Sequence, residues 1–346
     1  MLIFFAALVL AIAATPLARR VAVTTGVVAT PNARRVHRRS TPMLGGIAIY
    51  LASVIALLVF SDRFYVPQLV GIFVGATFVS FLGLTDDRWN LSPLVKFAGQ
   101  VVAAGVLVLT GIKVQVFPNE ALNLAVTLVW VIGVVNALNL VDNMDGLSGG
   151  IAAIASAFFL LLAVGSGQFL VGSLAAALLG ACLGFLYYNF NPASIFMGDS
   201  GSLFLGYVLA ATALKLKLDP VDSVGWIVPV LILGLPIFDT TLVCLSRLRR
   251  GVSPLQGGKD HTSHRLVRLG WTHREAVMAL YLVCGALGLL ALFAAKGSAS
   301  EAIAIGAIVL VVGVMALAKL EGVDLAPETV SPGARLPNDE TSSTGS

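Results

Sequence analysis

The chain has 346 residues, of which 58% are hydrophobic and only 12% are charged, and its formal net charge is +4. A soluble globular domain has about 25% charged residues, so this chain has too little polar surface to cover a water-soluble body. The three cysteines (Cys182, Cys244 and Cys284) lie inside apolar runs without CxxC spacing, which gives no support to a disulfide framework or a zinc site.

Apolar segments of membrane-spanning length recur along the chain. A bilayer core needs roughly 20 apolar residues per helix, with a range of about 17–25. The runs are continuous rather than alternating, so we expect an all-α integral membrane protein, a bundle of about eleven transmembrane helices, and not a β-barrel. The expected spans are Leu2–Leu17, Leu44–Phe60, Leu69–Leu84, Val95–Leu109, Leu122–Leu140, Gly150–Val164, Phe169–Tyr188, Ser202–Leu216, Val224–Val243, Ala276–Ala294 and Ala302–Ala318.

The basic residues predict the orientation of the bundle. The first span is apolar from its start and is followed by Arg19 and Arg20, which indicates a retained helix rather than a cleaved signal peptide. With the N-terminus outside, most Lys and Arg residues fall on cytoplasmic connections, as the positive-inside rule requires. The C-terminus is then cytoplasmic. We treat residues 1–320 as one membrane domain and residues 321–346, rich in Pro, Ser, Thr and Gly, as a disordered tail.

Two adjacent carboxylates end the third expected span, in GLTDDRWNLSPLVK. Asp86 and Asp87 repel each other, so one pKa should rise unless a cation lies between them, which suits a Mg²⁺ site or a general base. A solvated turn with two acids is the alternative. Lys96 lies about one turn inside the next expected helix, where it can meet a phosphate.

The fifth expected span ends in NALNLVDNMDGL. Asn136 and Asn139 are spaced i, i+3 and make one helix face polar, and Asp142 and Asp145 continue into a glycine-marked loop. Helix capping is the alternative role for these residues. Two Asn and two Asp within ten residues exceed what capping needs, so we favour a binding role.

The eighth expected span is preceded by IFMGDSGS. Gly198 and Gly201 flank Asp199 and allow a ligand to approach the backbone closely. Magnesium sites typically use one or two carboxylates together with substrate phosphates, which makes Asp199 a candidate ligand. Phe196 can stack on a nucleobase, although a phenylalanine in a membrane protein is more often a packing residue.

A long basic connection carries DHTSHRL. His261 and His264 are spaced i, i+3 beside Arg265, and this cationic setting favours diphosphate binding over zinc, for which two ligands are too few. His37 and His273 lack such neighbours, and we expect both to be solvated.

These segments together resemble the polyprenyl-phosphate N-acetylhexosamine-1-phosphate transferase family, of the glycosyltransferase family 4 type. The matching stretches, in order, are TPMLGGIAIY, GLTDDRWNLSPLVK, NALNLVDNMDGL, IFMGDSGSLFLGY, PIFDTT and DHTSHRL. The resemblance covers residues 40–270, which is most of the membrane domain. It implies a bundle of ten or eleven helices with a cytoplasmic active site, in agreement with the expected spans.

The resemblance implies transfer of a sugar 1-phosphate from a UDP-sugar to undecaprenyl phosphate, with release of UMP. It assigns Mg²⁺, or Mn²⁺ in its place, to Asp199. It also implies a bacterial plasma membrane location, contact with membrane lipid and no nucleic acid partner; a homodimer stays open. The remaining assignments are catalytic or diphosphate-proximal roles for Asp86, Asp87, Lys96, His261 and His264, and substrate binding by Asn139, Asp142, Asp145, Phe196 and Arg265, with Asp142 and Phe196 at the uracil.

The histidine segment bears on the donor sugar. Phospho-N-acetylmuramoyl-pentapeptide transferases carry three adjacent histidines, whereas the N-acetylglucosaminyl enzymes usually carry two after a first one; this chain has Ser263 before His264. The segment is nearer to the second group, so UDP-N-acetylglucosamine is the expected donor and the muramoyl-pentapeptide reaction is the alternative. A secondary transporter is the rival from another class, but transporters place charged sites near the bilayer midplane rather than at span ends.

Overall fold

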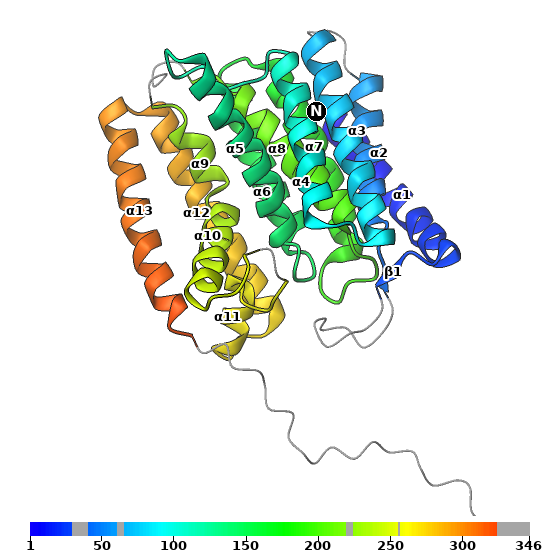
Figure 1. Cartoon of the computed structure of the whole chain (residues 1–346). Coiled ribbons are helices and arrows are strands. Elements are labelled where there is room, and N and C mark those ends of the chain that lie inside the picture. Colours follow the sequence, from blue (N-terminus) through cyan, green and yellow to red (C-terminus); the bar gives the residue numbers. More distant parts are fainter. Residues whose placement is uncertain (30–40, 61–65, 219–223, 255–256, 324–346) are drawn as a thin grey trace, which may run out of the picture.

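The computed structural model describes residues 1–29, 41–60, 66–218, 224–254 and 257–323, and the tail expected beyond Glu321 lies almost wholly outside these residues. The described residues form thirteen helices and one two-stranded hairpin (Figure 1). The elements are α1 (Leu2–Thr25), β1 (Val28–Ala29), β2 (Thr41–Pro42), α2 (Gly45–Phe60), α3 (Val66–Trp89), α4 (Pro93–Leu109), α5 (Glu120–Leu140), α6 (Leu147–Gly165), α7 (Phe169–Asn189), α8 (Asp199–Lys215), α9 (Ile227–Ile232), α10 (Gly234–Arg249), α11 (Thr262–Arg268), α12 (His273–Lys296) and α13 (Ala299–Glu321).

The prediction of an all-α membrane protein is confirmed. Within the described residues, seven helices are long and apolar enough to cross a membrane, namely α1, α3, α5, α6, α7, α12 and α13. Two shorter apolar helices, α2 and α4, run beside them in the same bundle (Figure 1). Each of the eleven expected spans falls on helix, while the number of membrane crossings and the orientation stay predictions.

Two expected boundaries are wrong. The first helix continues past Leu17 to Thr25, so Arg19 and Arg20 belong to the helix and not to the loop after it. The helix ends where Gly26 adopts a left-handed conformation with φ of 73°, which glycine tolerates without strain. The ninth expected span is divided into α9 and α10 at Leu233, because Pro236 has no N–H to donate four residues back in a continuous helix.

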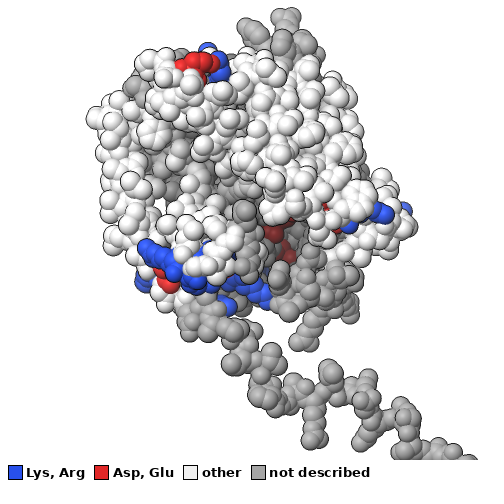
Figure 2. All heavy atoms as spheres, viewed as in Figure 1, with Lys and Arg blue, Asp and Glu red and all other residues white. Residues whose placement is uncertain are grey.

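Charged side chains gather at one end of the bundle. Figure 2 shows most Lys and Arg atoms on the end that carries α11, with acidic atoms visible in a recess there. The α5–α6, α7–α8 and α10–α11 connections reach the same end (Figure 1). Four of the arginines expected on this side (Arg34, Arg35, Arg38 and Arg39) lie outside the described residues.

Helix α8 is the most enclosed helix of the bundle, with every residue from Ser200 to Ala213 buried. It packs against α3, α5 and α2. At its first turn the packing is backbone to backbone: a Cβ on Gly46 of α2 would collide with the backbone of Gly201, and a Cβ on Gly83 of α3 would collide with that of Asp199 and Ser200. Small residues at helix crossings allow this close approach.

The short hairpin extends this contact. Strands β1 and β2 are antiparallel, with Val28 opposite Pro42. The chain after β2 then pairs with the α7–α8 connection: Phe196 N donates to Pro42 O at 2.8 Å, and Gly45 N donates to Phe196 O at 2.9 Å. The stretch TPMLGG therefore fixes the backbone that leads into Asp199.

We predict that Gly83→Ala destabilises the protein, because the added methyl group forces α3 away from the first turn of α8. Overpacking of this kind costs typically about 1–3 kcal/mol. Gly105→Ala in α4 is the matched control, since a Cβ there meets no atom within 4 Å and alanine favours the helix. Thermal unfolding in detergent checks both variants, and an equal melting temperature for the two would contradict the prediction.

Candidate active site

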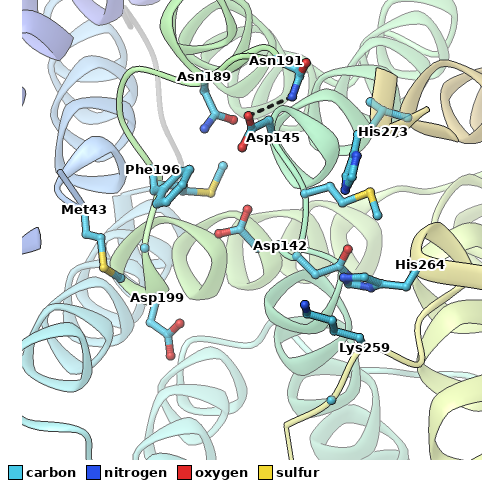
Figure 3. A pocket seen from close by; sticks show the side chains of 16 residues that line it. Met43, Asp142, Asp145, Asn189, Asn191, Phe196, Asp199, Lys259, His264 and His273 are labelled. Carbon is cyan, nitrogen blue, oxygen red and sulfur yellow. Dashed lines mark hydrogen bonds between the residues drawn. The ribbon is translucent and has the colours of Figure 1, made fainter. Parts of the chain in front are cut away.

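A cavity of about 320 Å³ opens among the connections at the charged end of the bundle. Five predicted site residues line it: Asp142, Asp145, Phe196, Asp199 and His264. In Figure 3, Phe196 and His264 lie on opposite sides of Asp142. The cavity therefore brings together side chains from three motifs that are far apart in the sequence. Its other lining residues are Met43, Asn143, Met144, Asn189, Asn191, Met197, Gly198, Gly258, Lys259, His273 and Val277.

Lys96 joins two carboxylates at one edge of this cavity. Its Nζ lies 2.8 Å from Asp86 Oδ2 and 2.5 Å from Asp199 Oδ2. Asp86 also accepts a hydrogen bond from the backbone N–H of Leu91 at 2.7 Å. A cation between two carboxylates lowers their mutual repulsion, which allows the two acidic groups to lie this close together. The sequence placed Lys96 near a phosphate but did not predict this bridge.

Asp87 contacts the backbone of α8. Its carboxylate accepts hydrogen bonds from the N–H groups of Asp199 at 2.9 Å and Ser200 at 3.2 Å. The residue at the N-cap of α8 is Gly198, which has no side chain for this purpose. The first N–H groups of a helix have no partner within the helix and are usually capped by the residue just before it. Here Asp87, from the neighbouring helix α3, takes that role for α8. Its contacts support a positioning role and distinguish it from Asp86.

Asn139 completes the surroundings of Asp199. Its Nδ2 donates to Asp199 Oδ1 at 3.0 Å and to Ser202 Oγ at 2.9 Å. Lys96 and Asn139 therefore hold the two carboxylate oxygens of Asp199 separately, one from α4 and one from α5. This orientation is imposed by two helices other than α8 itself, and the i, i+3 pattern of Asn136 and Asn139 was its only sequence signal.

The two aspartates of the α5–α6 turn have different surroundings. Asp145 accepts from Asn191 Nδ2 at 3.1 Å and from the backbone N–H of Ala193 at 2.9 Å, which ties this turn to the α7–α8 connection (Figure 3). Asp142 projects into the cavity. Burial raises the pKa of Asp142 to about 7, and the charges of Asp199 and Asp145 add to this rise. Asp142 can therefore donate or accept a hydrogen bond near neutral pH.

Only one of the two predicted histidines lines the cavity. His264 of α11 does so, with a buried Nδ1 that has no hydrogen-bond partner among the residues that the structure describes. His261 is instead 4% exposed, and its Nδ1 lies 2.7 Å from Asp239 Oδ2. Asp239 also accepts from the backbone N–H of Thr262 at 2.6 Å. His261 and Asp239 thus fasten the start of α11 to α10. The ring of His261 lies 5.8 Å from that of His264 but does not itself line the cavity.

Arg265, expected at the substrate, lies elsewhere. It is fully buried and donates to Asp260 O at 2.9 Å, to Ser246 Oγ at 2.8 Å and to Leu320 O at 2.6 Å. Since all three partners belong to the protein, the geometry supports a bracing role for this guanidinium between α10, α11 and the end of α13. An i+1 neighbour of His264 on a helix faces a different direction, which explains the difference.

Asp260 anchors the same connection. Its carboxylate accepts from Arg247 at 2.9 and 2.7 Å and from Arg250 at 2.8 Å. Burial alone would raise the pKa of Asp260, but the hydrogen bonds and charge of Arg247 outweigh burial and hold that pKa below its usual range. The segment that carries His264 is therefore attached to α10 by charged groups.

Sequence reasoning missed several cavity residues. His273 was expected to be solvated, yet it lines the cavity (Figure 3). Asn143 was also missed, although it follows Asp142 directly. Lys259, which lies two residues before His261 in the basic connection, also lines the cavity and was not among the predicted site residues. Asn189 and Asn191 belong to the stretch NFNP, whose two amides are a polar signal at the end of an apolar span. His37 lies outside the described residues.

The carboxylates suit a divalent cation whose remaining coordination positions are filled by the substrate. In the described part of the chain, no group of three or more His, Cys, Asp or Glu side chains is arranged to hold a metal ion. Asp86 and Asp199 nevertheless both contact one cationic nitrogen, so their oxygens converge on a single point of positive charge. Magnesium commonly takes one or two carboxylates and fills its other positions with water and substrate phosphates.

Comparison with known proteins adds independent information. The family model described as Glycosyl transferase family 4 matches residues 69–217. The chain is 36% identical to a Bacillus subtilis (strain 168) protein named "Probable undecaprenyl-phosphate N-acetylglucosaminyl 1-phosphate transferase", over 81% of this chain and 80% of that protein. It is 34% identical to decaprenyl-phosphate N-acetylglucosaminephosphotransferase of Mycolicibacterium smegmatis, over 79% and 76% of the two chains. It is 30% identical to undecaprenyl-phosphate alpha-N-acetylglucosaminyl 1-phosphate transferase of Salmonella typhimurium, over 78% and 77%.

The surroundings of His264 predict a pH effect on stability. Burial, and then the charge of His261, lowers the pKa of His264 from 6.5 to about 4. The unfolded chain therefore binds a proton at this residue more readily than the folded chain, so its contribution to stability is full above pH 6.5 and is lost as the pH falls towards 4. We predict that His264→Gln loses less thermal stability than the wild type between pH 7 and pH 4.5. An equal fall in melting temperature for the two proteins over this pH range would contradict the assigned effect of His264.

Proposed function

This chain belongs to glycosyl transferase family 4, and we propose that it transfers N-acetylglucosamine 1-phosphate from UDP-N-acetylglucosamine to undecaprenyl phosphate, with release of UMP. The observation that carries the proposal is the convergence of Asp86, Lys96 and Asp199 beside a cavity that also holds Asp142, Phe196 and other polar side chains. Two of the relatives above are named as undecaprenyl-phosphate N-acetylglucosaminyl 1-phosphate transferases, and the third as a decaprenyl-phosphate N-acetylglucosaminephosphotransferase. These names support both the sugar and the class of lipid in the proposal.

In the proposed reaction, an oxygen of the lipid phosphate attacks the β-phosphorus of the donor. The new P–O bond forms as the bond from that phosphorus to the bridging oxygen of UMP breaks, and UMP leaves with the electron pair. The second pKa of a phosphate monoester is about 6, so the acceptor is largely ionised at neutral pH and needs little help from a base. Asp86 then orients the acceptor and removes any remaining proton. We favour this direct displacement over a covalent aspartyl intermediate.

The cavity supplies the donor site in this proposal. Phe196 offers an aromatic face to the uracil, and Asp142 offers a hydrogen bond to its polar edge, for which a pKa of about 7 suits either direction of donation. Lys259 and His264 lie on the opposite wall, where the diphosphate would meet positive charge and an N–H donor (Figure 3). Positioning and electrostatics of this kind account for most of the catalysis in phosphoryl transfer.

We further propose that the reaction requires Mg²⁺, with Mn²⁺ as a substitute, held by Asp199. When bound, the ion would neutralise the donor diphosphate and stabilise the charge that develops on the transferred phosphate. Lys96 contacts the carboxylates of Asp86 and Asp199 and would hold them in place beside the ion. The cation-rich end of the bundle would face the cytoplasm of a bacterial plasma membrane, where a soluble nucleotide donor and a lipid phosphate can both reach the site.

The alternatives lead to different expectations. A phospho-N-acetylmuramoyl-pentapeptide transferase would use a larger, peptide-bearing donor, and the names of the relatives do not favour it. A secondary transporter would place its charged site near the bilayer midplane. Here the carboxylates lie at the end of α3 and the start of α8, at the charged end of the bundle.

A donor panel tests the proposal. We expect the purified protein, given undecaprenyl phosphate and Mg²⁺, to release UMP and form a lipid product with UDP-N-acetylglucosamine. Product formation with only UDP-N-acetylmuramoyl-pentapeptide would show that the sugar is wrong. Transport of a substrate into liposomes, without UMP release from any UDP-sugar, would support the transporter instead.

The metal assignment predicts a large effect for Asp199→Asn. The amide keeps the size of the side chain and an acceptor oxygen for Asn139 but removes the anionic oxygen, so turnover should fall by orders of magnitude. Chelation of divalent cations should abolish wild-type turnover, and added Mg²⁺ should restore it. Near wild-type turnover of Asp199→Asn at saturating Mg²⁺ would exclude this residue as the essential ligand.

A further inference from the structure

A pair of amides, one of them buried and the other partly buried, joins α4 to α5 near the carboxylates. Gln100 of α4 is 2% exposed. Its Nε2 donates to Asn136 Oδ1 at 3.3 Å, and Asn136 Nδ2 donates back to Gln100 Oε1 at 2.6 Å. Asn136 Nδ2 also donates to the backbone oxygen of Ile132 at 2.8 Å. The two side chains therefore satisfy each other within an apolar interface.

Such a pair is not needed merely to hold two helices together. Apolar side chains pack α4 on α5 without the cost of removing amides from water. A reciprocal amide pair does, however, restrict the two helices to one relative position, because a shift of either helix leaves buried polar atoms unpaired. Polar residues buried in membrane-spanning segments are for this reason associated with function.

The pair lies one helical turn from the groups that hold Asp199. Lys96 and Gln100 are spaced i, i+4 on α4, and Asn136 and Asn139 are spaced i, i+3 on α5, so each couple lies on one helix face. Lys96 binds Asp199 Oδ2, and Asn139 binds Asp199 Oδ1. The distance and rotation between α4 and α5 thus decide whether both oxygens are held at once.

We infer that Gln100 and Asn136 are positioning residues for sugar-phosphate transfer, which act by fixing α4 against α5 so that Lys96 and Asn139 hold Asp199 in its reactive orientation. The inference rests on the proposed function. Neither amide lines the donor cavity, so loss of the pair should slow the chemical step and leave donor binding nearly unchanged. A misplacement of about 1 Å at reacting groups can reduce a rate by about 100-fold.

The test is a repair experiment on the full-length protein in detergent. Gln100→Asn shortens one arm by a methylene group, so the amides no longer meet, and kcat should fall about 10- to 100-fold. The KM and the calorimetric Kd for UDP-N-acetylglucosamine should stay within about twofold of wild type, because kcat alone falls when an interaction acts only in the transition state. Adding Asn136→Gln to the same chain lengthens the other arm and should restore most of kcat.

The matched control removes another interhelical hydrogen bond. Tyr50 of α2 and Thr77 of α3 are joined through their hydroxyl groups at 2.8 Å, about two turns and a half from Asp86 along α3. Tyr50→Phe combined with Thr77→Val should lower the melting temperature and leave kcat close to wild type. A second variant, Gln100→Leu with Asn136→Leu, removes both amides together, so no buried polar atom is left unpaired, and it should fold with a low kcat.

The outcomes separate the inference from the proposed function. A wild-type protein that releases no UMP from any UDP-sugar contradicts the proposed function. An active wild type with unchanged kcat in Gln100→Asn, or with equal loss in the Tyr50–Thr77 control, overturns the positioning role. Failure of Asn136→Gln to restore any kcat to Gln100→Asn, while both variants melt as the wild type does, overturns it as well.

Discussion

The first turn of α8 is the part of the structure on which the rest of the site depends. Backbone contacts at Gly46 and Gly83 hold it between α2 and α3 with no space for a side chain. Asp87 then accepts the free N–H groups of this turn, so the same helix that presses on α8 also caps it. Because Asp199 is the first residue of α8, its carboxylate inherits a fixed position, and an enclosed helix provides the rigid support that a reactive group requires.

Charge balance at this point links the fold to the proposed chemistry. Asp86 and Asp199 share Lys96, while Asp87 and Asp142 are close enough to interact with Asp199. The cluster therefore contains four acidic side chains around one lysine. A divalent cation and a diphosphate, taken together, would complete such a site, which supports the proposed metal requirement without a cage of protein ligands.

The cavity has two walls that come from distant parts of the chain. One wall is formed by the α5–α6 and α7–α8 connections, and the other by the segment around α11. Ser263 Oγ donates to Asn143 Oδ1 at 2.7 Å and joins the two walls directly. Asp239, Asp260 and Arg265 fasten the second wall to α10 and α13 through hydrogen bonds. Ser263, which stands directly before His264 in DHTSHRL, therefore has a structural contact of its own.

The sequence by itself determined the helices and the family, because both depend on local patterns. The length of an apolar run is set by the thickness of a bilayer, and each expected span indeed falls on helix. The motifs around Asp142 and Asp199 also predicted four of the cavity residues, namely Asp142, Asp145, Phe196 and Asp199. Tertiary structure decided which side chains meet. Asp87 caps a helix 112 residues away, His261 turns to Asp239 while His264 lines the cavity, and Arg265 braces α13. Spacing along a helix gives the face that two residues share, but the rotation of that helix against its neighbours, which packing alone fixes, decides what the face contacts.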